Sequence, residues 1–180
     1  TFREALRAGV AVYRALREII SSQGLNTNVG DEGGFAPSVP SNRAALELTL
    51  AAVEKAGYTP GKDCFLGLDV AASELTAQGG YNLARDGITL PSENLVDFYE
   101  NWTREFHVLS IEDGLGEDDW EGWQSLSQRL GDRVQLVGDD LFTTNTTRIK
   151  KGLELKAANA VLLKLNQIGT LTETVEAFKM

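Results

Sequence analysis

Short runs of apolar residues alternate with amphipathic stretches in the part of the chain that follows residue 60. A strand that is apolar without alternation is typical of a parallel sheet, because both of its faces are covered by helices. Strands that alternate with helical patterns therefore predict successive parallel β/α units. The pattern leaves two α/β architectures open, a (β/α) barrel or an open doubly wound sheet. The four runs lie at residues 64–68, 108–111, 134–137 and 160–163.

Helices are predicted wherever apolar residues recur at steps of three and four. The longest such pattern covers residues 2–22, and a second begins at the capping residue Ser41 and continues through Ala56. Thr170 and Glu173 have the spacing of a capping box, which predicts a further helix after them. Shorter patterns lie at residues 95–106, at 120–130 and around 149–153, and a small hairpin is predicted at 80–90.

An ionisable residue follows each of the four apolar runs. In a parallel barrel the carboxyl ends of the strands meet at one rim, so these four side chains should converge there. For any one of them alone, a helix cap or a loop position is the more common explanation. Three acids and then a base in consecutive units are harder to explain in that way. The four residues are Asp69, Glu112, Asp139 and Lys164.

Convergent carboxylates need a counter-charge. At about 4 Å and an effective dielectric constant near 20, each pair of carboxylates costs on the order of 4 kcal/mol. An all-oxygen site made of a few carboxylates suits Mg²⁺, while protonation or pairing with Lys164 is the alternative relief. Beside bound cations the pKa of Lys164 should fall, which would make it a base for a weakly acidic C–H proton.

The remaining polar motifs are less specific. The loop Gly30–Gly34 contains Glu32 among glycines that permit unusual backbone angles, and it is interpreted either as a functional loop or as a plain surface loop. Asp118 and Asp119 should cap the helix that follows them. Of Asp139 and Asp140, only one side chain should face the rim.

Composition excludes several classes of function. The net charge of −9 disfavours non-specific binding to nucleic acid or to anionic membranes. No apolar run approaches the roughly 20 residues that span a bilayer. A single cysteine, Cys64, and a single histidine, His107, exclude a disulfide scaffold and make a zinc site of the usual type improbable.

These motifs resemble those of the enolase family, and of its bacterial members in particular. The stretches that carry the resemblance are GDEGGFAP (30–37), GLDVAASE (67–74), SIEDGL (110–115) with VGDDLFTTN (137–145), and KLNQIGTLTET (164–174). The resemblance implies a magnesium-dependent carbon–oxygen lyase of glycolysis that interconverts 2-phosphoglycerate and phosphoenolpyruvate. It implies that Lys164 abstracts a proton and that Glu32 assists loss of the hydroxyl. Asp69, Glu112 and Asp139 would bind Mg²⁺.

The same resemblance implies that residues 1–180 are an incomplete C-terminal barrel domain with about half of the strands of a (β/α)₈ barrel. The family's N-terminal domain and the last part of its barrel have no counterpart here. We therefore expect the isolated chain to be unstable and inactive. The resemblance also implies a homo-oligomer in the cytoplasm, with the cell surface or secretion as further locations. The alternatives are another member of the superfamily that acts on a different carboxylate, and a non-catalytic surface or scaffold role.

Overall fold

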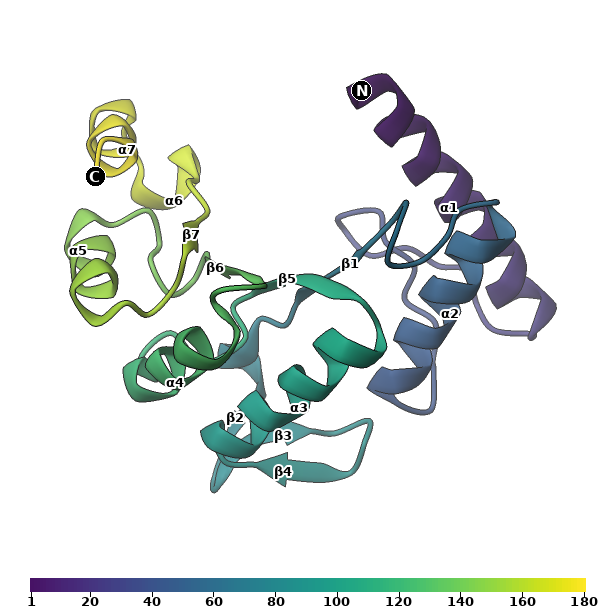
Figure 1. Cartoon of the computed structure of the whole chain (residues 1–180), viewed down its shortest axis with the longest axis horizontal. Coiled ribbons are helices and arrows are strands. Elements are labelled where there is room, and N and C mark those ends of the chain that lie inside the picture. Colours follow the sequence, from purple (N-terminus) through teal and green to yellow (C-terminus); the bar gives the residue numbers. More distant parts are fainter. The chain divides into compact units, whose positions relative to one another are not determined.

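A computed structural model covers residues Thr1–Met180 and divides into two compact units, Thr1–Phe65 and Leu66–Met180. Figure 1 labels the helices and strands of both units. No helix in the structure combines the length and the hydrophobicity that a bilayer span requires.

The first unit is built on two helices, α1 (Phe2–Ser22) and α2 (Asn42–Lys55). Each helix begins after a residue whose hydroxyl caps it. Thr1 accepts a hydrogen bond from the N–H of Glu4, and Ser41, the cap that the sequence predicted, accepts one from the N–H of Ala44. The helices pack on each other through buried apolar side chains, which are Ala15, Ile20, Leu46, Ala52 and Val53.

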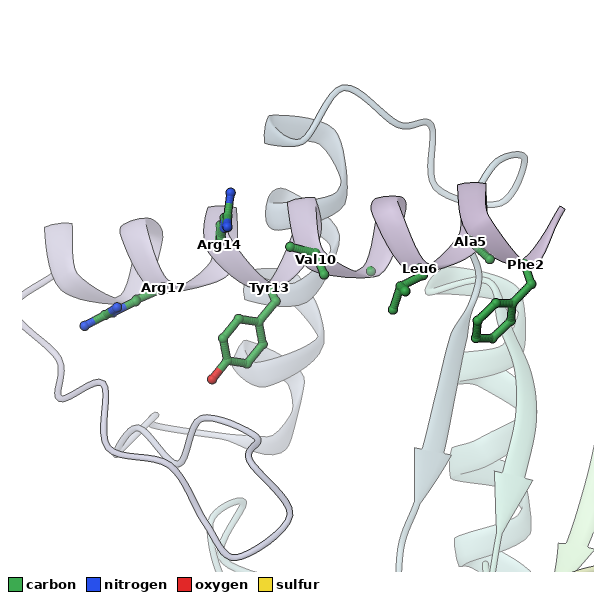
Figure 2. A pocket seen from close by; sticks show the side chains of 8 residues that line it. Phe2, Ala5, Leu6, Val10, Tyr13, Arg14 and Arg17 are labelled. Carbon is green, nitrogen blue, oxygen red and sulfur yellow. The ribbon is translucent and has the colours of Figure 1, made fainter.

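Helix α1 also carries an apolar face with no covering element. Phe2, Leu6, Val10 and Tyr13 follow one side of the helix at steps of three and four, and all four are exposed (Figure 2). Tyr13 alone has partners, in the glycine-rich loop: its ring stacks on Phe35 at 4.4 Å and its hydroxyl donates to the carbonyl of Gly33 at 3.0 Å.

The second unit contains a parallel sheet of four strands. Its members are β1 (Leu66–Asp69), β5 (Val108–Glu112), β6 (Gln135–Gly138) and β7 (Ala160–Val161). They lie in the order β1-β5-β6-β7, so each strand neighbours the next one along the chain. A doubly wound sheet reverses its strand order at a switch point, and no reversal occurs here. This consecutive order is the one expected of part of a (β/α)₈ barrel, and it favours the barrel over the doubly wound alternative.

Helices lie between these strands and after the last of them, and the sequence predicted all of them except the short α6. They are α3 (Ser92–Glu105), α4 (Trp120–Leu130), α5 (Thr146–Leu155), the short α6 (Leu165–Ile168) and α7 (Leu171–Phe178). Thr170 caps α7 by accepting from the N–H of Glu173. A 3₁₀ turn (Ala72–Leu75) and a small antiparallel sheet of β2 (Thr76–Ala77), β3 (Gly80–Leu83) and β4 (Ile88–Leu90) fill the connection from β1 to α3. The predicted hairpin at 80–90 is thus confirmed.

Phe142 packs tightly between the end of β6 and helix α5. A Cβ atom added at Gly138 would come within 2.5 Å of the Phe142 ring, and one added at Gly152 would overlap the same ring. Both glycines therefore serve close packing, and together they fix the turn that follows β6.

Replacing Gly152 by alanine should destabilise α5, while the same change at Gly9 should stabilise α1. Both glycines lie inside helices, where alanine gains about 0.5–1 kcal/mol. At Gly9 an added Cβ meets nothing within 4 Å, so the gain is kept. At Gly152 the overlap with Phe142 costs about 1–3 kcal/mol, which exceeds the gain. Amide hydrogen exchange within each helix measures the two effects, and a stabilised α5 in the Gly152 variant would contradict the packing argument.

Candidate active site

The carboxyl ends of the four parallel strands bring the predicted strand-end residues to one rim. Asp69 and Glu112 are the last residues of β1 and β5, and they are paired in register across the two strands. Asp139 follows β6 directly, and Lys164 lies three residues after β7, where it is the N-cap of α6. All four residues therefore lie at the same edge of the sheet.

Asp139 and Lys164 are in direct contact. The Lys164 Nζ donates to Oδ2 of Asp139, and Gln167 Nε2 donates to the other carboxylate oxygen, Oδ1, at 3.0 Å. The side chain of Asp139 is 8% exposed and that of Lys164 is 44% exposed. The hydrogen bond that Lys164 donates to Asp139 raises the pKa of Lys164 above its ordinary value, against a smaller lowering by burial. In this arrangement the amine is protonated at neutral pH.

Glu112 lies near three other carboxylates of the rim. Its pKa is raised first by burial and then by the neighbouring charges of Asp69, Asp139 and Asp113, while Lys164 opposes the rise. A carboxyl whose ionisation is opposed by three other carboxylates is one that a cation would stabilise. The electrostatics of this rim therefore favour a bound dication.

Asp113, the residue after Glu112, joins the acidic cluster and was not singled out from the sequence. It is buried, with a left-handed backbone φ of 42°. Its carboxylate accepts hydrogen bonds from the backbone N–H groups of Asp139 (3.1 Å), Asp140 (2.8 Å) and Leu141 (3.4 Å). Burial raises the pKa of Asp113, and these three donors oppose the rise. Asp113 thereby ties the end of β5 to the turn after β6.

The donor set fits a hard cation. Carboxylate oxygens of Glu112, Asp113 and Asp139 lie within 4.8 Å of one another. Asp69, which the sequence predicted as a ligand, is not a member of this group of three. It is paired in register with Glu112 and raises the pKa of Glu112. Oxygen-only ligands are the preference of Mg²⁺, whereas zinc and copper sites use histidine and cysteine.

Glu32 lies in the first unit, whereas the four strand-end residues lie in the second. It is exposed at the tip of a tight loop. The loop closes through a bridge between Val29 and Phe35 and through the N–H of Gly30, which donates to the carbonyl of Gly34 at 2.9 Å. The hydroxyl of Tyr13 holds the loop to α1. The loop thus presents Glu32 on a defined turn.

Of the two acids at 118–119, Asp119 has the capping role that the sequence predicted, whereas Asp118 forms an ion pair with Arg148 at 3.1 Å. Asp119 is the N-cap of α4 and accepts from the N–H of Gly122 at 3.0 Å. Its other carboxylate oxygen accepts from the hydroxyls of Tyr81 (2.7 Å) and Ser92 (2.6 Å). Asp119 therefore connects the small antiparallel sheet, α3 and α4.

Comparison with known families agrees with this architecture. A family model described as the enolase C-terminal TIM barrel domain matches residues 1–180, the whole of the chain. The barrel-type strand order and the acidic rim at the carboxyl ends of the strands are the features expected of such a domain. The chain belongs to the enolase C-terminal TIM barrel domain family.

Proposed function

We propose that this domain is the catalytic barrel of a magnesium-dependent lyase that interconverts 2-phosphoglycerate and phosphoenolpyruvate. The observation that carries the proposal is the contact between Lys164 and Asp139 at a rim where Asp69 and Glu112 also end their strands. This rim joins a cation site to a base, which is what proton abstraction beside a carboxylate requires.

In this proposal Asp69, Glu112 and Asp139 bind the magnesium ion. Asp113 is close enough to be an alternative ligand, but both of its carboxylate oxygens already accept backbone N–H groups. We therefore assign Asp113 to support of the turn and Asp69 to the ligand set. When bound, Mg²⁺ stabilises the negative charge that develops on the substrate carboxylate.

Lys164 is proposed to take the proton from C2 of 2-phosphoglycerate. Its pKa is raised by the Asp139 carboxylate, so neutralisation of that carboxylate by a cation favours the free amine. Glu32 is proposed to give a proton to the hydroxyl that leaves C3, so that one water molecule is released. In the reverse reaction Lys164 returns a proton to C2, and Glu32 takes one from the water molecule that adds to C3.

We further propose that the domain acts within a longer polypeptide. The parallel sheet has four strands, half of the number in a (β/α)₈ barrel. Its outer strands, β1 and β7, each have one parallel neighbour, and Leu171 and Phe178 on α7 are 68% and 77% exposed. Open edges and apolar helix faces of this kind favour aggregation unless other elements cover them.

The test is turnover of 2-phosphoglycerate by the longer protein that completes the barrel, hereafter the complete enzyme, with Mg²⁺ and after its removal by a chelator. Formation of phosphoenolpyruvate that stops with the chelator supports the proposal. A parallel assay with sugar acids separates this activity from that of another superfamily member. Turnover of a sugar acid without turnover of 2-phosphoglycerate would overturn the substrate assignment.

Replacing Asp139 by asparagine should weaken Mg²⁺ binding by more than roughly 10–100-fold, the range for residues that merely support a ligand. The neutral amide keeps the shape of the side chain but removes a charged oxygen from the rim. Calorimetric titration of the complete enzyme with Mg²⁺ measures the change. Asp132→Asn makes the same charge change at an exposed position and should leave the affinity unaltered. An unchanged affinity in the Asp139 variant would transfer the ligand role to another acid of the rim.

A further inference from the structure

Thr144 stands out because it is fully buried and has an unfavourable backbone conformation. Its side chain is 0% exposed, and its φ of 55° lies in the left-handed region. A β-branched residue rarely adopts that conformation. Such conformations persist only where the surrounding structure fixes them, and they cluster at functional sites.

The hydroxyl of Thr144 closes a ring of hydrogen bonds around the rim. Its Oγ1 accepts from the backbone N–H of Lys164 at 2.8 Å and donates to Oε1 of Gln167 at 3.1 Å. Gln167 Nε2 then donates to Oδ1 of Asp139 at 3.0 Å, and Lys164 Nζ donates to Oδ2 of the same carboxylate. One hydroxyl therefore contacts the main chain of Lys164 directly and orients Asp139 through Gln167.

We propose that Thr144 is a positioning residue that holds Lys164 and Asp139 in their relative places at the rim. The inference deepens the proposed function and rests on it, because it concerns the groups that we assign to the base and to the cation. The hydroxyl of Thr144 contacts the main chain of Lys164 and the side chain of Gln167, so it acts through these residues.

The hydrogen bonds at position 144 require a group that accepts and donates at once. A hydroxyl has both capacities, and here both are used, by Lys164 and by Gln167. Serine would preserve both contacts. Valine and alanine would preserve neither: the Lys164 N–H would lose its acceptor and the Gln167 amide would lose the donor that fixes its orientation.

Four side chains at position 144 separate the hydroxyl from the branched shape. Threonine and serine carry the hydroxyl, and valine and alanine lack it. Threonine and valine are branched, whereas serine and alanine are not. If the branched shape decides the result, the proteins with threonine and with valine should behave alike. If the hydroxyl decides it, the proteins with threonine and with serine should behave alike.

The first readout is amide exchange in the complete enzyme without metal or substrate. The Lys164 N–H should exchange faster in Thr144→Val and Thr144→Ala, by roughly 2–10-fold, the effect of losing a hydrogen bond of ordinary strength. In Thr144→Ser it should exchange as in the original protein. The Leu136 N–H, which donates to Asn159 Oδ1 at 2.7 Å, is the internal reference and should not change.

The second readout is steady-state kinetics of the same four proteins with 2-phosphoglycerate. The two variants without the hydroxyl should lose roughly 10–100-fold in kcat, as expected for a displaced reacting group, with little change in KM. Thr144→Ser should recover most of the rate. Thr143→Val is the matched control, because Thr143 also has a positive φ, of 46°, and its hydroxyl donates to the carbonyl of Phe142.

Each failure has a distinct meaning. Equal acceleration at Lys164 and at Leu136 would show general loosening of the fold and would overturn a specific role for Thr144. Grouping by branching, or an unchanged kcat in the valine variant, would overturn it as well. Absence of turnover in the original protein would refute the proposed function, and the exchange pattern would then decide by itself whether Thr144 holds Lys164.

Discussion

Replacing Lys164 by alanine is expected to lower kcat of the complete enzyme for 2-phosphoglycerate by roughly 10²–10⁴-fold, the contribution of a positioned general base. The Lys164 amine lies at the rim against Asp139, and its side chain is 44% exposed. Loss of a half-exposed side chain at the N-cap of the short helix α6 should leave the fold intact. Circular dichroism of the variant checks the fold, and the formation of phosphoenolpyruvate measures the rate.

A second substitution separates the two roles that Lys164 can have. Arginine at this position keeps a positive charge that pairs with Asp139, but its guanidinium does not lose a proton near neutral pH. If Lys164 acts only as the partner of Asp139, the arginine variant should be nearly as active as the original protein. If Lys164 is the base, arginine should be about as slow as alanine.

Lys150→Ala is the matched control for these variants. Lys150 lies on helix α5 and is exposed, so its removal makes the same change of charge away from the rim. Its rate should equal that of the original protein. A near-normal rate in Lys164→Ala, with the control also normal, would remove Lys164 from the proposed mechanism.

The local features of this fold were predictable because neighbouring residues determine them. Apolar runs without alternation indicated parallel strands, and the spacing of Thr170 and Glu173 indicated the start of α7, which the structure confirms. The convergence of Asp69 and Glu112 followed from the rule that parallel strands end at one edge. Each of these predictions depends on a short segment and on a general rule of topology.

Features that depend on distant segments were not predictable. The sequence left a barrel and a doubly wound sheet open, because the order of strands in a sheet leaves no mark on periodicity. Asp113 was overlooked because its role depends on three N–H groups from the turn after another strand. Thr144 likewise has partners at positions 164 and 167, and nothing in its own segment identifies them.

Replacing Trp123 by alanine is expected to destabilise helix α4 by about 3–5 kcal/mol, the range for a buried aromatic side chain. Trp123 is 0% exposed, and its Nε1 donates to the carbonyl of Gly116 at 3.2 Å. The N–H of Gly116 donates to the hydroxyl of Tyr81 at 2.9 Å. Removal of the indole therefore leaves a large cavity in the loop that follows Glu112. It also removes one of the two hydrogen bonds to the Gly116 carbonyl, which still accepts from the N–H of Asp119 at 3.1 Å.

Trp120→Ala makes the same substitution in the same helix and is the control. Trp120 is only partly buried, and Lys151 Nζ lies 4.2 Å from its ring centroid. A cation–π contact at such a site contributes about 0.5–1 kcal/mol, so this variant should lose much less stability. Amide exchange of α4 in the complete enzyme gives the free energy of opening for both variants. Equal losses for Trp120 and Trp123 would show that burial of the Trp123 indole does not hold α4 in place. A larger loss for Trp123, with faster exchange at Gly116, would show that this indole fixes both the helix and the loop beside the acidic rim.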